Sequence, residues 1–238
     1  MMNFLKIKSE NDKIFRENAY PDMQSEDCFQ VTSAPVQRNQ QFHVDENLIC
    51  TDTITAILMH GKGKTIALNF ANAMFPGGGY ILGGNAQEEA LCRASLLYYS
   101  IRTVKRYYHA NRLHILPDYT NHMIYSANVP VIRDNAGNLL ESPGICDFIT
   151  CPAVNRTFAK FCFSKKKLDS IMTERISQII QLCALKKPDT LILGAFGCGV
   201  FGNERETVYP MFETAVNQYL TDEIKIIFAD PSAKNNYF

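Results

Sequence analysis

Residues 64–89 read KTIALNFANAMFPGGGYILGGNAQEE, and this stretch contains the features that decide the fold. It begins at 64–70 with a run of apolar residues that is typical of a strand buried in a sheet. Glycines follow at 77–79, and Gln87-Glu88-Glu89 then opens a segment with the apolar spacing of a helix. A strand, a glycine-rich turn and a helix in this order predict an α/β domain.

The same alternation continues on both sides of this stretch. We expect strands at residues 47–51, 64–70, 123–127, 129–133, 144–150, 190–193 and 223–228. We expect helices at 53–59, 88–104, 168–185 and 206–219. These elements predict a mainly parallel or mixed sheet. Residues 1–46 are more polar and predict an N-terminal helix and loop extension packed on a domain of residues 47–238.

Composition excludes several classes of protein. The chain has 238 residues, of which 46% are hydrophobic, so it is long and apolar enough to bury a sizeable core. Its 24 Lys and Arg balance 24 Asp and Glu, whereas a general nucleic-acid binder carries a basic surplus. No apolar run approaches the ~20 residues that cross a bilayer. We expect no membrane and no general nucleic-acid partner.

The cysteines and histidines indicate the compartment and the need for metal. None of the eight cysteines forms a CxxC pair, and most lie in apolar or glycine-rich stretches, which is typical of reduced thiols in a cytosol. We expect a cytoplasmic protein, although delivery into another cell stays open. The histidines at 109, 114 and 122 fit no closed ligand set. We expect neither a metal nor a cofactor.

A second glycine loop follows the apolar strand at 190–193. Residues 194–203 read GAFGCGVFGN and contain the GxGxxG spacing of dinucleotide binders. Only one helix and one strand remain beyond this loop, which is too little for a dinucleotide-binding half, so we reject a Rossmann dehydrogenase. The loop nevertheless lies at the C-terminal end of a buried strand, where its backbone amides could bind a diphosphate.

Two adjacent carboxylates, Glu88 and Glu89, open the helix after the first glycine loop. An acidic first turn is also an ordinary feature of helices, because it complements the helix dipole. Adjacent helical residues do not face the same way, so one carboxyl could reach ligand hydroxyls and the other a leaving group. Cleavage of a sugar bond requires a protonated carboxyl at the leaving oxygen. The well-separated pair of carboxylates of most glycosidases is not evident here.

Three glycines, seven residues and then Gln-Glu-Glu resemble the signature of the bacterial-type poly(ADP-ribose) glycohydrolases of the macrodomain superfamily. Residues 68–73 (LNFANA), 125–134 (YSANVPVIRD), 150–155 (TCPAVN) and 194–203 also resemble segments of that family. The similarity runs from about residue 47 to residue 230. It implies a three-layer α/β/α macrodomain-like fold with a mixed central sheet. It also implies a metal-independent glycosidase that releases ADP-ribose from poly(ADP-ribose) or an ADP-ribosylated protein.

The resemblance also implies roles for individual residues. Glu89 would be the catalytic acid, and Glu88 would bind the hydroxyls of the distal ribose. The implied substrate-binding residues are Asp52 at the adenine, Asn72 at the distal ribose, Gln87 within the motif, and Gly77, Gly78, Gly79, Gly197, Cys198, Gly199, Val200 and Phe201 around the diphosphate. An exposed helix N-cap is an equally good interpretation of Asp52.

Three other functions remain open. A mono-ADP-ribosyl protein hydrolase would use the same pocket to reverse one specific side-chain modification. A non-catalytic ADP-ribose-binding macrodomain would have no need of the Glu-Glu pair. A packed α/β domain with incidental glycine turns would not bind ADP-ribose. We expect a monomer whose partners are ADP-ribose, its polymer or an ADP-ribosylated protein, and the natural acceptor stays open.

Overall fold

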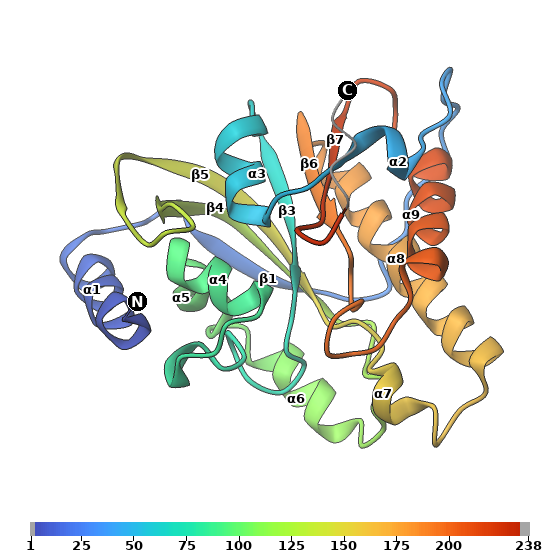
Figure 1. Cartoon of the computed structure of the whole chain (residues 1–238), viewed down its shortest axis with the longest axis horizontal. Helices are drawn as coiled ribbons and strands as arrows, with labels where there is room; N and C mark the ends of the chain where they lie inside the picture. Colours follow the sequence, from blue (N-terminus) through green and yellow to red (C-terminus); the bar gives the residue numbers. More distant parts are fainter. Residues whose placement is uncertain (1–2, 234–238) are drawn as a thin grey trace.

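A central sheet organises the computed structural model, which describes residues 3–233 (Figure 1). The strands in this part of the chain are β1 (Gln24–Cys28), β2 (Leu48–Ile49), β3 (Thr65–Phe70), β4 (Met123–Arg133), β5 (Leu139–Cys151), β6 (Thr190–Gly194) and β7 (Lys225–Ala229). The helices are α1 (Phe4–Glu17), α2 (Val44–Asn47), α3 (Thr53–His60), α4 (Gln87–Ala94), α5 (Leu97–Ile101), α6 (Lys105–Leu113), α7 (Arg156–Ala159), α8 (Lys165–Lys186) and α9 (Arg205–Tyr219). A 3-10 turn, η1 (Tyr80–Leu82), precedes α4.

The sheet is mixed, as predicted. Its seven strands in the described part of the chain lie in the order β1-β4-β5-β3-β6-β7-β2. The pairs β5–β3, β3–β6, β6–β7 and β7–β2 are parallel, whereas β4 runs antiparallel to both β1 and β5. The parallel strands therefore end at one common edge of the sheet, and the loops that follow them meet there.

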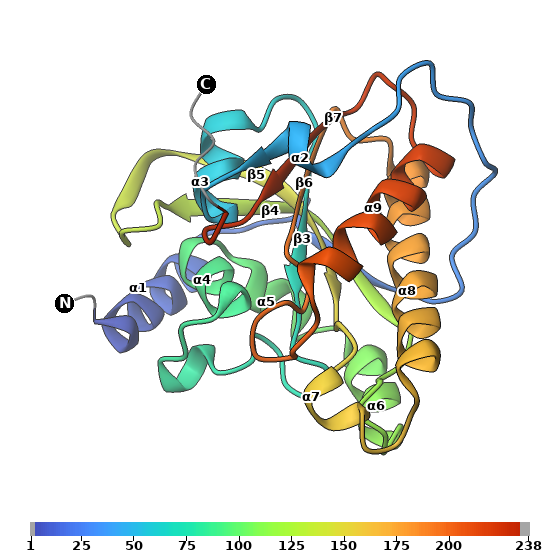
Figure 2. The ribbon, with the colours of Figure 1, turned by 45° about the vertical axis from the view of Figure 1, so that its right-hand side comes forward.

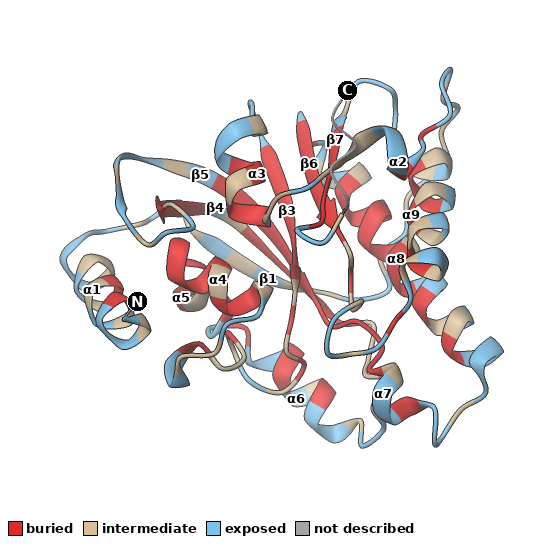
Figure 3. Ribbon diagram, in the orientation of Figure 1, coloured by how far each residue is buried: buried red, intermediate tan, exposed pale blue. Residues whose placement is uncertain are grey.

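Helices cover both faces of the sheet, so the predicted three-layer α/β/α fold is confirmed (Figures 1 and 2). Successive residues of β3 point to opposite faces. Ile66 and Leu68 join the core beneath α8 and α9, and Ala67 joins the core beneath α3, α4 and α5. Strands β3, β4, β6 and β7 are buried along most of their length (Figure 3). Continuous apolar runs such as 190–193 arise because both faces of the strand are covered.

The N-terminal segment contains a strand in addition to the helix and loops that we expected. Asn3 caps α1 by accepting a hydrogen bond from the N–H of Lys6 at 3.0 Å. The polar strand β1 then pairs with β4, from Gln24 opposite Ala127 to Cys28 opposite Met123. This strand escaped prediction because QSEDC lacks an apolar alternation. The predicted division at residue 47 stays a prediction.

The helix expected at 88–104 is wrong in extent, because it breaks at Ser95. α4 ends at Ala94, and α5 begins only at Leu97. Between them Ser95 is extended and forms a bridge with Val131 of β4, and the N–H of Leu96 donates to the carbonyl of Pro130 at 2.9 Å. Pairing with a distant strand thus overrides a helical pattern that is locally consistent.

The division into two strands at 123–127 and 129–133 is also wrong, because β4 is continuous from Met123 to Arg133. Its pairing with β5 shifts register between Ser126 and Val129, and Asn128 within that bulge has φ +55°. The bulge lets the strand bend without ending. Across residues 3–233, no helix combines the length and the apolar character needed to cross a membrane.

Candidate active site

Two adjoining cavities open where the parallel strands end. One, of about 270 Å3, is bordered by Asp52 at the start of α3 and by Pro231 after β7. The other, of about 310 Å3, lies against the loop after β6. Its loop residues are Gly197, Gly199, Val200 and Phe201. The residues common to both cavities are Phe70, Ala86, Gln87 and Ala195, so the cavities form one groove across the ends of β3 and β6.

Glu88 lies in the first turn of α4 and is only 3% exposed. Its Oε2 accepts a hydrogen bond from the backbone N–H of Asn72 at 2.7 Å, and its Oε1 accepts one from the amide of Asn69 at 3.3 Å. Burial raises the pKa of Glu88 to about 8, against the opposing effect of these hydrogen bonds. At neutral pH this carboxyl group is therefore mostly protonated.

Glu89 is held differently from its neighbour. Its Oε1 accepts a hydrogen bond from the backbone N–H of Gly79 at 2.7 Å, and its Oε2 accepts one from that of Ala86 at 2.9 Å. In the bond from Ala86 the third helical residue reaches back to the N–H of the N-cap, as the Glu of a capping box does, although the alanine side chain cannot return a second bond. Two backbone donors thus fix the carboxyl that the resemblance assigns as the acid.

The first glycine loop lies against both carboxyl groups. Gly78 has φ +55°, and a Cβ there would lie 2.6 Å from Oε1 of Glu89 and 3.1 Å from Oε2 of Glu88. Only glycine combines this backbone conformation with so close an approach. Gly77 has φ +69°, and Gly79 gives its N–H to Glu89. The structure therefore brings these three glycines to the Glu pair, and their contact with a diphosphate stays a prediction.

Gln87 and Asn72 use much of their hydrogen-bonding capacity within the protein. The Gln87 amide donates to the carbonyl of Leu68 at 2.8 Å and accepts from the N–H of Phe70 at 2.9 Å, which ties α4 to the end of β3. Asn72 Oδ1 accepts from the N–H groups of the two residues at 74 and 75 and so shapes the turn after β3. Gln87 also lines both cavities of the groove. Their contacts with substrate stay predictions.

The second glycine loop is held in place by the protein itself. Gly197 has φ +73°, and a Cβ there would lie 2.5 Å from the Cβ of Ala153. The amide of Asn203 donates to the carbonyls of Val154 at 2.8 Å and Gly197 at 3.1 Å, which closes the loop. A loop fixed in this way has less conformational entropy to lose when it binds an anion.

The remaining residues of this loop differ in exposure. Val200 is 86% exposed at the rim, whereas Phe201 is half-buried, with its ring centroid 6.0 Å from that of Tyr119. Burial raises the pKa of Cys198 to about 11, so this residue stays a thiol at neutral pH. All eight cysteines of the chain are free.

Asp52 fits both of its sequence interpretations at once. It is the N-cap of α3, and its Oδ1 accepts from the N–H of Thr55 at 2.9 Å. The same residue borders the first cavity of the groove. Its contact with adenine stays a prediction, and the cap is a separate structural role.

Three polar residues at the site were not predicted as site residues from the sequence. Asn69 donates to Glu88 and, at 3.1 Å, to Thr150 of β5. Asn203 closes the second loop, and Arg93 of α4 donates to the carbonyl of Gly84. Asn69 was detectable as an amide inside an apolar strand, since a buried polar group needs a partner. The partners of Asn203 and Arg93 carry no local signal.

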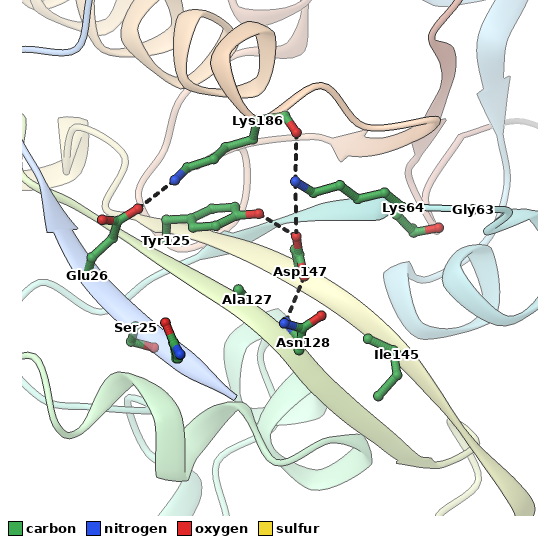
Figure 4. Close-up of a pocket in the computed structure, with 12 residues that line it drawn as sticks. Ser25, Glu26, Gly63, Lys64, Tyr125, Ala127, Asn128, Ile145, Asp147 and Lys186 are labelled. Atoms are coloured by element: carbon green, nitrogen blue, oxygen red, sulfur yellow. Dashed lines mark hydrogen bonds and ion pairs between the residues drawn. The ribbon is translucent and has the colours of Figure 1, made fainter. Parts of the chain in front are cut away.

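A cavity of about 700 Å3 lies at the opposite end of β3 (Figure 4). Its lysines and carboxylates pair with one another. Lys186 contacts Glu26 at 2.6 Å, and Lys64 lies 3.9 Å from Asp147, which also accepts from Tyr125. This balance leaves no excess positive charge for a diphosphate, and none of the predicted site residues lines the cavity. Within residues 3–233 no group of three or more His, Cys, Asp or Glu side chains is placed to hold a metal.

The mixed sheet and the groove at its C-terminal edge define a protein of the macrodomain class. A family model described as "Microbial-type PARG, catalytic domain" matches residues 4–134, more than half of the chain. A search of curated proteins found no match. The chain belongs to the microbial-type PARG catalytic-domain family.

Solved structures of poly(ADP-ribose) glycohydrolases are similar to this chain. The enzyme from Thermomonospora curvata bound to the inhibitor ADP-HPD shares 26% identity, with a TM-score of 0.81, over 98% of this chain and 95% of that one. The enzyme from Deinococcus radiodurans in complex with ADP-ribose shares 34% identity, with a TM-score of 0.69, over 76% of this chain and 75% of that one. Its apo form shares 31% identity, with a TM-score of 0.65, over 76% and 72%.

Proposed function

We propose that the chain is a poly(ADP-ribose) glycohydrolase that cleaves the O-glycosidic bond between ADP-ribose units and releases ADP-ribose. The observation that carries this proposal is the pair of buried carboxyls, Glu88 and Glu89, packed against Gly78 beside the groove. Membership of the microbial-type PARG family supports the substrate class. The solved relatives with ADP-ribose and ADP-HPD support it as well.

The proposed reaction uses Glu89 as a general acid. Its carboxyl donates a proton to the departing oxygen while the bond from C1 of the ribose to that oxygen breaks. A water molecule adds to the oxocarbenium-like C1 and returns a proton to Glu89, so the carboxyl is restored after each turnover. The N–H groups of Gly79 and Ala86, which bind the Glu89 oxygens, stabilise the carboxylate formed between these two steps.

The other proposed contacts follow the groove from end to end. Glu88 and Asn72 bind the distal ribose, and the loop from Gly197 to Phe201 binds the diphosphate through its backbone. Asp52 binds the adenine at the far end. Because Glu88 is mostly protonated at neutral pH, it can donate a hydrogen bond to a ribose hydroxyl as well as accept one.

The decisive experiment measures release of ADP-ribose from labelled poly(ADP-ribose) by the wild type and by Glu89→Gln. Loss of one positioned general acid lowers the rate by about 100-fold or more. Calorimetry with free ADP-ribose serves as the control, because the variant should bind the product as the wild type does. Equal activity of the two proteins contradicts the assignment of Glu89.

A second substrate separates the neighbouring functions. The same assay on a mono-ADP-ribosylated protein tests the narrower hydrolase, which would act on that substrate and leave the polymer intact. Binding of ADP-ribose without release from either substrate indicates a reader. Absence of binding indicates a packed domain without a site.

We also propose that the enzyme acts as a monomer in the cytoplasm. The eight free thiols support a reducing compartment. Light scattering of the purified protein and fractionation of the source cells test these two points.

A further inference from the structure

Arg93 is a buried charged residue that the proposed reaction does not use. It lies on α4, one turn after Glu89, and it is only 7% exposed. Its side chain donates to neutral acceptors rather than to a carboxylate. Burial lowers the pKa of Arg93. A buried charge without an ion-pair partner is costly, so its position needs an explanation.

The guanidinium of Arg93 holds the turn at residues 84–85. One terminal nitrogen donates to the carbonyl of Gly84, and the other donates to Oδ1 of Asn85 at 2.7 Å. The two bonds use the rigid fork of the guanidinium, which a lysine does not possess. The ring of Phe4, on α1, covers the guanidinium carbon at 4.1 Å from its centroid.

The 84–85 turn in turn holds Glu89. A Cβ on Gly84 would lie 3.0 Å from Cγ of Glu89, so the turn packs directly on this side chain. The N–H of Gly84 donates to the carbonyl of Gly79 at 2.9 Å. Gly79 and Ala86 are the two backbone donors to the Glu89 carboxyl. Both donors therefore adjoin the segment that Arg93 holds.

Helix α1 fixes the backbone of Arg93 as well as its side chain. Asn11 of α1 is fully buried, and its amide donates to the carbonyl of Arg93 at 2.9 Å. Its Oδ1 accepts from Nε of Arg133 at 3.0 Å. α1 packs against both α4 and η1, and Figure 2 shows it beside α4. Helix α1, which contributes no residue to the lining of either cavity of the groove, thus contacts Arg93 through two side chains, Phe4 and Asn11.

We infer that Arg93 is a positioning residue for the reaction, since it holds the 84–85 turn against the carboxyl of Glu89. Because this role rests on the proposed function, Glu89 must be the acid for Arg93 to affect the rate. Without the hydrogen bonds from Arg93 to the 84–85 turn, the Glu89 carboxyl can move relative to the leaving oxygen. A misplacement of about 1 Å lowers a rate by about 100-fold.

The first test is Arg93→Ala, assayed for kcat, KM and ADP-ribose affinity. We expect kcat to fall about 10- to 100-fold, while the Kd of free ADP-ribose changes less than about threefold. Millimolar guanidinium should restore part of the kcat of Arg93→Ala and none of that of Glu89→Ala. Arg93→Lys should recover only part of the activity, because it keeps the charge and loses the fork.

The second test leaves α4 and the groove untouched. Phe4→Ala removes the ring from the guanidinium, and we expect a smaller fall in kcat of about threefold to tenfold. Leu5→Ala is the matched control, since Leu5 is the next residue of α1 and is 60% exposed. This control should keep the wild-type kcat.

Three results overturn the inference. The first is a folded Arg93→Ala enzyme with wild-type kcat or without a response to guanidinium. The second is a loss of ADP-ribose affinity as large as the loss of kcat. The third applies if Arg93→Ala does not fold, and it is a wild-type kcat in Phe4→Ala. A wild-type protein that releases no ADP-ribose contradicts the proposed function instead.

Discussion

Glu88 and Glu89 are adjacent in the chain, but their carboxyl groups are in different surroundings. Glu88 is the more deeply buried of the two, and its pKa rises to about 8 through that burial. Glu89 accepts hydrogen bonds from two backbone N–H groups. A neutral Glu88 places no negative charge beside the proposed acid, and it offers a ribose hydroxyl both a donor and an acceptor. The two roles are therefore separated by environment rather than by distance.

Glu88 gives the fold a specific dependence on pH. Its pKa is about 8 in the folded chain against an ordinary value of 4.5, so between these values the folded chain holds a proton that the unfolded chain has lost. Stability must then fall as pH rises through this window. For Glu88→Gln we expect the fall in unfolding free energy between about pH 5 and about pH 8 to be smaller by roughly 3 to 4 kcal/mol. Urea denaturation at both pH values measures it, and equal falls contradict it.

The elements that apolar periodicity predicted are those buried on the sheet or against it. β3, β6 and β7 and the helices α3, α8 and α9 all came close to their predicted bounds for this reason. β1 is polar and half-exposed, so its only signal is the partner strand. The break after α4 depends on Val131, which is far away in the sequence. Local patterns cannot encode either feature.

The candidate site, like the fold, was predictable from the sequence only where its residues form a local pattern. The spacing of the glycines and of Gln87, Glu88 and Glu89 is a local pattern, and it located the loop and the helix that form the site. Which atoms hold the carboxyls was not predictable, because Asn69 acts from β3 and is itself held by Thr150 of β5. Such contacts are decided by the three-dimensional arrangement of elements.

Helix α3 allows the two roles of Asp52 to be separated. A serine can cap the helix but has no carboxylate with which to bind the adenine. An alanine can neither cap the helix nor bind the adenine. We expect Asp52→Ala to cost about 1 kcal/mol of stability and Asp52→Ser to cost less than about 0.5 kcal/mol. Both variants should weaken ADP-ribose binding about tenfold, as expected for a lost hydrogen bond to a charged group. Thermal denaturation and calorimetry measure the two effects, and wild-type affinity in Asp52→Ser removes adenine binding from this residue.

At the scale of the whole molecule, the formal net charge is zero, although the proposed substrate is a polyanion. The proposed diphosphate site is the backbone of the loop after β6. The Asn203 amide donates to the carbonyl of Gly197 across this loop, and Gly197 has φ +73°. Oriented amides act at short range and do not attract a polyanion along its length. The enzyme is therefore suited to one ADP-ribose unit at a time.

This charge balance predicts a weak effect of salt. Between about 50 and 200 mM salt, a protein that binds many phosphates loses about 1000-fold or more in affinity. For ADP-ribose we expect a loss of less than about threefold, because few counterions are released at a backbone site. Calorimetric titrations across this range measure the slope. A steep slope would mean that lysines and arginines outside the groove contribute to binding.

The pairing of β1 with β4 also determines what happens to the sheet after proteolysis of the N-terminal segment. β1 is the edge strand on this side of the sheet, and it covers the backbone of β4 from Met123 to Ala127. A protease that removed the N-terminal segment would leave this row of N–H and C=O groups open. An uncovered strand of this kind recruits strands from other molecules and promotes aggregation. Nicked enzyme would then be lost through self-association, even with every residue of the groove intact.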